Sequence, residues 1–288
     1  MMSTSHASTD TDTTHTVISQ DGAKISYLTM GSGPAVLVIP GALSIAADYT
    51  AFASALAEHF TVHIIERRGR GTSSPQGDDY SISKEREDVL ALQQKTGASL
   101  LVGHSFGGLV ALEVARNNQA LTKLAVYEPG VSIDGSIPTS WMPGYEKKLA
   151  EKDYAGAFVE FITGMGPESM RKIPHWYMKL LLPLIMSSHE RKQKLGLLQE
   201  SLREHKEIAS LDNSYENYQE ISAGVLFMNG GKGHTALAER NMKRLTAVFP
   251  HAETKGFPKL DHFGINKKAP REVARAVSDY FLREQATH

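Results

Sequence analysis

Residues 99–111 read SLLVGHSFGGLVA, and this stretch decides the fold of the chain. An apolar run precedes Ser105, glycine stands two positions before and two positions after it, and an apolar, helix-forming run follows. A tight turn from strand to helix strains the serine backbone, and a Cβ at Gly103 or Gly107 would collide with it. This pattern is a nucleophile elbow, which leaves the serine hydroxyl exposed at the tip of the turn. We therefore predict that Ser105 is a nucleophile; the alternative is a glycine-rich turn that holds an incidental serine.

Length, charge and cysteine content narrow the class of protein. The chain has 288 residues and a formal net charge of −1, without a strongly basic or acidic block. Its length suits one large domain with an insertion, and its charge gives no reason to expect nucleic acid or a membrane as a partner. It has no cysteine, which excludes disulfides and thiolate metal sites and fits a reducing compartment. We expect a cytoplasmic protein that binds a small-molecule substrate without a metal or cofactor, in an oligomeric state that the sequence does not reveal.

The first residues differ in composition from the rest. Residues 1–14 are rich in Ser, Thr, Asp and His and lack the basic region and apolar run of a signal peptide. They carry too little apolar surface to offset the entropy lost on ordering, so we expect a disordered tail. No apolar run in the chain is long enough to span a bilayer.

Strand-like and helical patterns alternate over most of the chain. We expect strands at residues 16–19, 24–28, 35–39, 61–65, 100–102, 123–127, 224–229 and 252–257. We expect the main helices at residues 46–58, 83–95 (with Ser83 as N-cap), 235–248 and 270–284, besides the elbow helix. Apolar strands that alternate with helices predict an α/β fold, a mostly parallel sheet with helices on both faces and an antiparallel hairpin at one edge. Only helical patterns occur between residues 131 and 218, so we predict a core of residues 15–130 and 219–288 with a helical insertion.

Four markers in this order resemble the α/β-hydrolase fold superfamily. They are Pro40-Gly41-Ala42 after a strand, ERRGRGTS at residues 66–73, the elbow at Ser105 and a late histidine in LDHF at residues 260–263. The resemblance covers nearly the whole chain after the tail, and it implies that residues 131–218 form a helical cap. It also implies that His262 is the catalytic base. The chemistry agrees, because a serine hydroxyl needs a base and the pKa of histidine lies near neutral pH.

The acid that orients the histidine departs from the superfamily's common pattern. Many members carry an aspartate after the strand that matches residues 225–228, but the loop here reads NGGKGH and has Gly233 at the expected place. Either the triad is broken or another carboxylate replaces the aspartate. We predict Glu128, which ends the strand after the elbow helix on the face where ligands bind in open α/β sheets. Asp212 is the weaker substitute, and Asp261 is too close in sequence to His262 to point at its far nitrogen.

Backbone N–H groups are expected to form the oxyanion hole. One comes from Phe106, directly after the nucleophile, and the other from Ala42, with Leu43 as the fallback. Three arginines in the 66–73 loop suggest an anion site, but we expect loop and surface roles for them: Arg67, Arg68 and Arg70. Apolar residues of the insertion are expected to form a roof over the site and bind substrate: Trp141, Met142 and Trp176.

The prediction is a serine hydrolase that cleaves a small, largely apolar carboxylic ester or related acyl compound through an acyl-enzyme. The same fold hosts lyases and cofactor-free oxygenases on a similar Ser–His pair, so the fold alone does not determine the reaction. A non-catalytic protein that binds a small ligand is the rival from another class, and the missing aspartate favours it.

Overall fold

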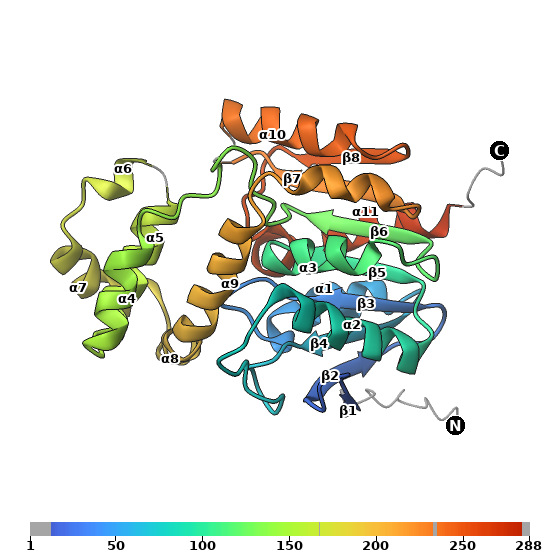
Figure 1. Ribbon diagram of the computed structural model, residues 1–288, viewed down its shortest axis with the longest axis horizontal. Coiled ribbons are helices and arrows are strands. Elements are labelled where there is room, and N and C mark those ends of the chain that lie inside the picture. Colours follow the sequence, from blue (N-terminus) through green and yellow to red (C-terminus); the bar gives the residue numbers. More distant parts are fainter. Residues whose placement is uncertain (1–12, 167, 233–234, 284–288) are drawn as a thin grey trace, which may run out of the picture.

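An eight-stranded sheet forms the centre of the molecule, with strand order β1-β2-β4-β3-β5-β6-β7-β8 (Figure 1). The computed structural model describes residues 13–166, 168–232 and 235–283. The strands are β1 (Thr13–Ile18), β2 (Lys24–Met30), β3 (Ala35–Ile39), β4 (Thr61–Glu66), β5 (Leu100–His104), β6 (Lys123–Tyr127), β7 (Gly224–Gly230) and β8 (Ala252–Phe257). β2 pairs antiparallel with β1 and β4, and all pairs from β4 to β8 are parallel. The predicted fold class is confirmed; β1 begins inside the predicted tail, whose first twelve residues lie outside the described ranges.

Helices cover both faces of the sheet because successive strand side chains point to opposite sides. In β3, Val36 and Val38 pack into the core on one side, and Leu37 and Ile39 pack into the core on the other. The first side is covered by η1 (Ala46–Tyr49), α1 (Thr50–Leu56) and α11 (Pro270–Leu282). The second is covered by α2 (Ile82–Thr96), α3 (Phe106–Ala115) and α10 (Ala236–Ala247).

The start of α2 corrects one expectation. The helix begins at Ile82, so Ser81 is the N-cap residue and Ser83 lies within the first turn. The Ser81 side chain makes no capping hydrogen bond. The N–H of Ile82 instead donates to Glu207 Oε2 at 2.8 Å, so a side chain distant in sequence caps this helix end.

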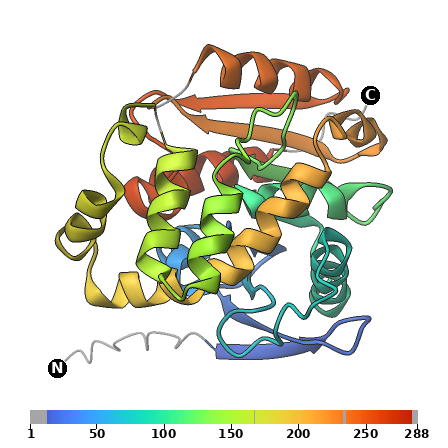
Figure 2. The ribbon, with the colours of Figure 1, turned by 60° about the vertical axis from the view of Figure 1, so that its left-hand side comes forward.

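A group of helices stands between β6 and β7 in sequence and apart from the sheet in space (Figures 1 and 2). The group consists of α4 (Met142–Ala150), α5 (Tyr154–Met165), α6 (Glu168–Arg171), α7 (His175–Ile185), α8 (Ser188–Gly196) and α9 (Leu198–Ser210), followed by η2 (Tyr215–Glu220). These helices share their own apolar cluster, which also buries Leu43 from the loop after β3. That loop therefore connects the helical group to the elbow region, and Ile208 of α9 does so as well, because it lies in the core cluster that contains Phe106. None of the described helices is long and apolar enough to cross a membrane.

The glycines of the elbow are required by close backbone packing. A Cβ at Gly103 would lie 2.4 Å from the carbonyl oxygen of Gly107, and a Cβ at Gly107 would lie 2.2 Å from that of Ile39. Both obstacles are backbone atoms, which cannot rotate away as a side chain could. The sequence Gly-x-Ser-x-Gly thus lets α3 pack directly against β5 and the end of β3.

We expect Gly107→Ala to lower the free energy of unfolding by about 1–3 kcal/mol or more, the usual cost of overpacking in a core. Gly196→Ala is the matched control, because a Cβ there meets no atom within 4 Å. Urea denaturation of both variants measures the difference. Equal stabilities for the two variants would contradict the packing argument.

Candidate active site

Ser105 occupies the joint between β5 and α3 with a strained backbone. Its φ is 54° and its ψ is −122°, a conformation that residues other than glycine rarely adopt. Its N–H donates to the carbonyl of Tyr127 at 3.0 Å, and its own carbonyl accepts the N–H groups of Gly108 and Gly130, both at 2.8 Å. The backbone is therefore fixed from two neighbouring elements while the side chain stays partly exposed.

His262 and Glu128 meet although 134 residues separate them. Nδ1 of His262 lies 2.7 Å from Oε2 of Glu128, with 41% of the histidine side chain and 20% of the glutamate side chain exposed. A carboxylate accepts a hydrogen bond, so Nδ1 carries the proton and Nε2 is left as a proton acceptor. This arrangement fixes the tautomer that a base beside a serine needs.

The last residue of β7 supports Glu128 through its backbone N–H. The second carboxylate oxygen, Oε1, accepts the N–H of Gly230 at 2.8 Å. A Cβ at Gly230 would lie 2.7 Å from the carbonyl oxygen of Leu260, so glycine is needed where the end of β7 passes the segment that carries His262. Gly233, at the place expected for an aspartate, lies outside the described residues.

The other two candidate carboxylates have different partners. Asp212 Oδ1 accepts from the hydroxyl of Ser132 at 2.5 Å and from the N–H of Gly135 at 3.0 Å. Asp261 Oδ1 accepts the N–H of Phe263 at 2.9 Å. Of the three carboxylates considered from the sequence, the structure brings Glu128 to His262.

A chain of hydrogen bonds runs behind the site from the loop after β3 to the histidine. The N–H of Gly41 donates to the hydroxyl of Tyr49 at 2.9 Å, and this hydroxyl lies 2.6 Å from Nδ1 of His104. Nε2 of His104 lies 2.8 Å from the carbonyl oxygen of His262. Burial lowers the pKa of His104 well below its usual value, and the proximity of His262 adds to this effect. Neutral His104 therefore accepts from Tyr49 and donates to His262, which links the two loops.

The two expected oxyanion donors both belong to segments next to Ser105. A Cβ on Gly41 would stand 3.1 Å from Cβ of Ser105, so the loop that carries Ala42 passes directly beside the serine. No acceptor within the described ranges takes the N–H of Ala42. Phe106 is the first residue of α3, where a backbone N–H has no acceptor in its own helix. Both N–H groups are therefore free to donate to a ligand. The N-terminus of α3 also favours a negative charge at this place, because of the helix dipole.

The expected roof residues separate into two groups. Trp141 and Met142 are buried in the apolar cluster that also holds Leu43. Trp176 departs from the expectation: it is 65% exposed, because α7 buries Met178 and Leu182 and turns its tryptophan outward.

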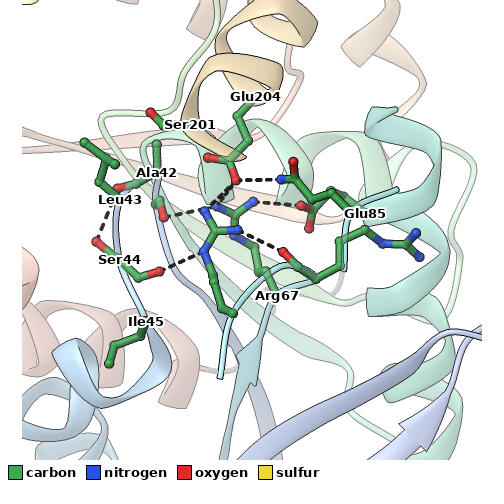
Figure 3. A network of polar contacts seen from close by, with 12 residues as sticks. Ala42, Leu43, Ser44, Ile45, Arg67, Glu85, Ser201 and Glu204 are labelled. Atoms are coloured by element: carbon green, nitrogen blue, oxygen red, sulfur yellow. Dashed lines mark hydrogen bonds and ion pairs between the residues drawn. The ribbon is translucent and has the colours of Figure 1, made fainter. Parts of the chain in front are cut away.

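The arginines of the 66–73 loop correct another expectation. Arg67, Arg68 and Arg70 were expected as loop and surface residues, but each is at most 1% exposed. Arg68 pairs with Asp88 at 2.6 Å, and the other two arginines meet Glu204 from α9 (Figure 3). Sequence reasoning missed Glu204, since its partners lie more than 130 residues earlier. The spacing of Glu200 and Glu204 by one helical turn was the available signal.

Comparisons with known proteins identify the family of the chain. A model described as the alpha/beta hydrolase family matches residues 36–276. The N-formylmaleamate deformylase of Pseudomonas putida is 30% identical over 159 residues, which are 54% of this chain and 56% of that protein. A pimeloyl-(acyl-carrier protein) methyl ester esterase of Klebsiella pneumoniae is 29% identical over 175 residues, or 58% of this chain and 66% of that protein. The match thus spans less than two thirds of the length of either relative.

A solved structure extends the likeness to nearly the full chain. An alpha/beta hydrolase from Sphaerobacter thermophilus superposes with a TM-score of 0.78 at 26% identity, covering 93% of this chain and 100% of that one. The family model alone spans well over half of the sequence. The chain therefore belongs to the alpha/beta hydrolase family.

Proposed function

We propose that the protein is a serine hydrolase that cleaves a small, largely apolar carboxylic ester or related acyl compound. The 2.7 Å hydrogen bond between His262 and Glu128 carries this proposal, because it supplies the partner that the missing aspartate left in doubt. The two relatives support the same class, since one is named as a methyl ester esterase and the other as a deformylase.

The proposed reaction begins at Ser105. Its Oγ forms a bond to the substrate carbonyl carbon while its proton passes to Nε2 of His262, and Glu128 stabilises the resulting imidazolium. The carbonyl oxygen becomes an oxyanion that accepts from the N–H groups of Phe106 and Ala42. His262 then returns the proton to the leaving alkoxide, which departs as an alcohol. Water, deprotonated by the same histidine, cleaves the acyl-enzyme and releases the acid.

The helical group of residues 131–218 is proposed to act as a cap over this site. Its buried cluster contains Trp141 and Met142 and packs on Leu43, next to the proposed oxyanion donor. An apolar roof favours an apolar acyl or ring portion in the substrate. Trp176 points outward and lies outside this cluster, so its position does not support the prediction that it binds substrate.

Labelling with a fluorophosphonate and turnover of a panel of chromogenic esters test the hydrolase proposal. We expect wild type to hydrolyse at least one ester and to be labelled once, and Ser105→Ala to lose labelling and at least about a thousandfold in kcat. A wild type that is neither labelled nor active, or equal labelling of Ser105→Ala, would favour the non-catalytic or non-hydrolytic rivals.

The identity of the acid has its own test. Glu128→Gln is expected to lower kcat by roughly a hundredfold to ten-thousandfold, because an amide cannot fix the tautomer and charge of His262 as a carboxylate does. Asp212→Asn is the control and should keep near-wild-type kcat. The reverse result, with an active Glu128→Gln and an impaired Asp212→Asn, would assign the acid to Asp212.

A further inference from the structure

A buried network of ions joins α9 of the helical group to the loop after β4 (Figure 3). One oxygen of Glu204, Oε1, lies 3.0 Å from Nη2 of Arg67, 2.5 Å from Nη2 of Arg70 and 3.2 Å from Nε2 of Gln76. The side chains of both arginines and of the glutamate are fully buried. Burial favours the neutral acid, but the two guanidinium groups outweigh it and lower the pKa of Glu204. Glu204 is therefore a buried carboxylate held by two positive charges.

The same two arginines hold the loop that carries the proposed oxyanion donor. Nη2 of Arg67 donates to the carbonyl of Gly41 at 3.1 Å, and Nε of Arg70 donates to the carbonyl of Ser44 at 2.9 Å. Figure 3 shows this loop on one side of Arg67, Glu85 on the other side and Glu204 above. The network thus forms hydrogen bonds to two backbone carbonyls of the loop, one before Ala42 and one after Leu43.

The hydrogen bond from Arg67 to the carbonyl of Gly41 determines where the N–H of Ala42 points. The carbonyl of Gly41 and the N–H of Ala42 belong to one peptide group, and this peptide is trans. In a trans peptide the C=O and N–H bonds point in opposite directions. Because the carbonyl points at buried Arg67, the N–H of Ala42 points away from it. Without that hold, the peptide could rotate and aim its carbonyl, an acceptor, at the developing negative charge.

Glu204 is in turn placed by packing of α9 on the elbow. A Cβ added at Gly130 would lie 3.4 Å from Cδ1 of Ile208, one turn after Glu204, and 3.4 Å from Cα of Phe106. The guanidinium of Arg67 stands 4.9 Å from the ring centroid of Phe106. Ile208 shares a core cluster with Phe106, and Leu198 and Leu202 of the same helix share one with Leu43, so α9 packs on the segments that provide both proposed oxyanion donors.

We infer that Glu204 is a positioning residue: through Arg67 and Arg70 it fixes the peptide between Gly41 and Ala42 so that the N–H of Ala42 faces the reacting carbonyl. This inference rests on the proposed hydrolase function. Glu204 comes from the helical group, so this group contributes to the chemistry of the oxyanion hole besides covering the site. Arg67 also pairs with Glu85, at 2.9 Å, and would retain this ion pair in a variant without the Glu204 charge. Arg70 would lose its ion pair with Glu204.

The test compares Glu204→Gln with Asp88→Asn. Asp88 is an equally buried carboxylate that pairs with the neighbouring Arg68, and the side-chain hydrogen bonds of Arg68 go to Asp88 and Asp21 and not to the loop after β3. Each variant replaces a carboxylate that pairs with a buried arginine of the 66–73 loop by a neutral amide. Both variants are therefore expected to unfold at a lower temperature than wild type. Kinetics are measured well below the unfolding midpoint of each variant.

Glu204→Gln should lower kcat for an ester about ten- to a hundredfold with KM within about threefold of wild type, because a misaligned donor is missed mainly in the transition state. The affinity for a trifluoromethyl ketone, which forms a tetrahedral oxyanion adduct, should fall by a similar factor. Asp88→Asn should keep both values near wild type. Arg67→Lys is the second variant if Glu204→Gln does not fold; it retains the charge, loses the forked donor, and should show the same split between kcat and KM.

An unchanged kcat and ketone affinity in folded Glu204→Gln, or in Arg67→Lys where that variant is used, would overturn the inference and leave the network a purely structural one. Equal kinetic losses in Asp88→Asn would overturn it as well. Failure of the hydrolase proposal itself would look different, since wild type would then neither turn over esters nor react with the ketone.

Discussion

The left-handed backbone of Ser105 is held by hydrogen bonds that also place its neighbours. A φ of 54° at a residue with a Cβ costs on the order of 1–3 kcal/mol and persists only where surrounding contacts impose it. Here the carbonyl of Ser105 accepts from Gly130, and its N–H donates to Tyr127. These two bonds bracket Glu128, so the strain that presents the serine and the position of the carboxylate have one structural origin.

The pairing of β6 with β7 explains why the carboxylate that contacts the histidine can come from the end of either strand. They pair in parallel, with Tyr127 opposite Met228, so their carboxyl ends lie side by side at the same edge of the sheet. A carboxylate from either end is near the histidine loop. In this chain the β6 end provides Glu128, whose longer side chain reaches His262, and the β7 end provides the N–H of Gly230 that holds it. The two strands thus divide between them the tasks of supplying the carboxylate and fixing its direction.

Local patterns in the sequence were sufficient for the sheet and the elbow, whereas His262 came from the resemblance to the α/β-hydrolase fold and Glu128 from its place at the end of a strand. The apolar run of residues 35–39 corresponds to a strand with the same bounds, because a strand covered on both faces is apolar along nearly its whole length. The pattern failed where burial depends on distant partners. Arg67 looks like a surface residue until Glu204 neutralises it, and no local pattern records that pairing. The apolar sequence of α7 is also compatible with several buried faces, so it could not show that Trp176 points outward.

The role of Glu128 is tested most directly by proton NMR of the hydrogen bond it makes with His262. An imidazole proton shared with a carboxylate resonates far downfield, separate from the amide protons. We predict such a resonance in wild type and in Asp212→Asn, and its loss in both Glu128→Gln and His262→Gln. A resonance that persists in Glu128→Gln, or that disappears in Asp212→Asn, would contradict the assignment of Glu128 as the acid.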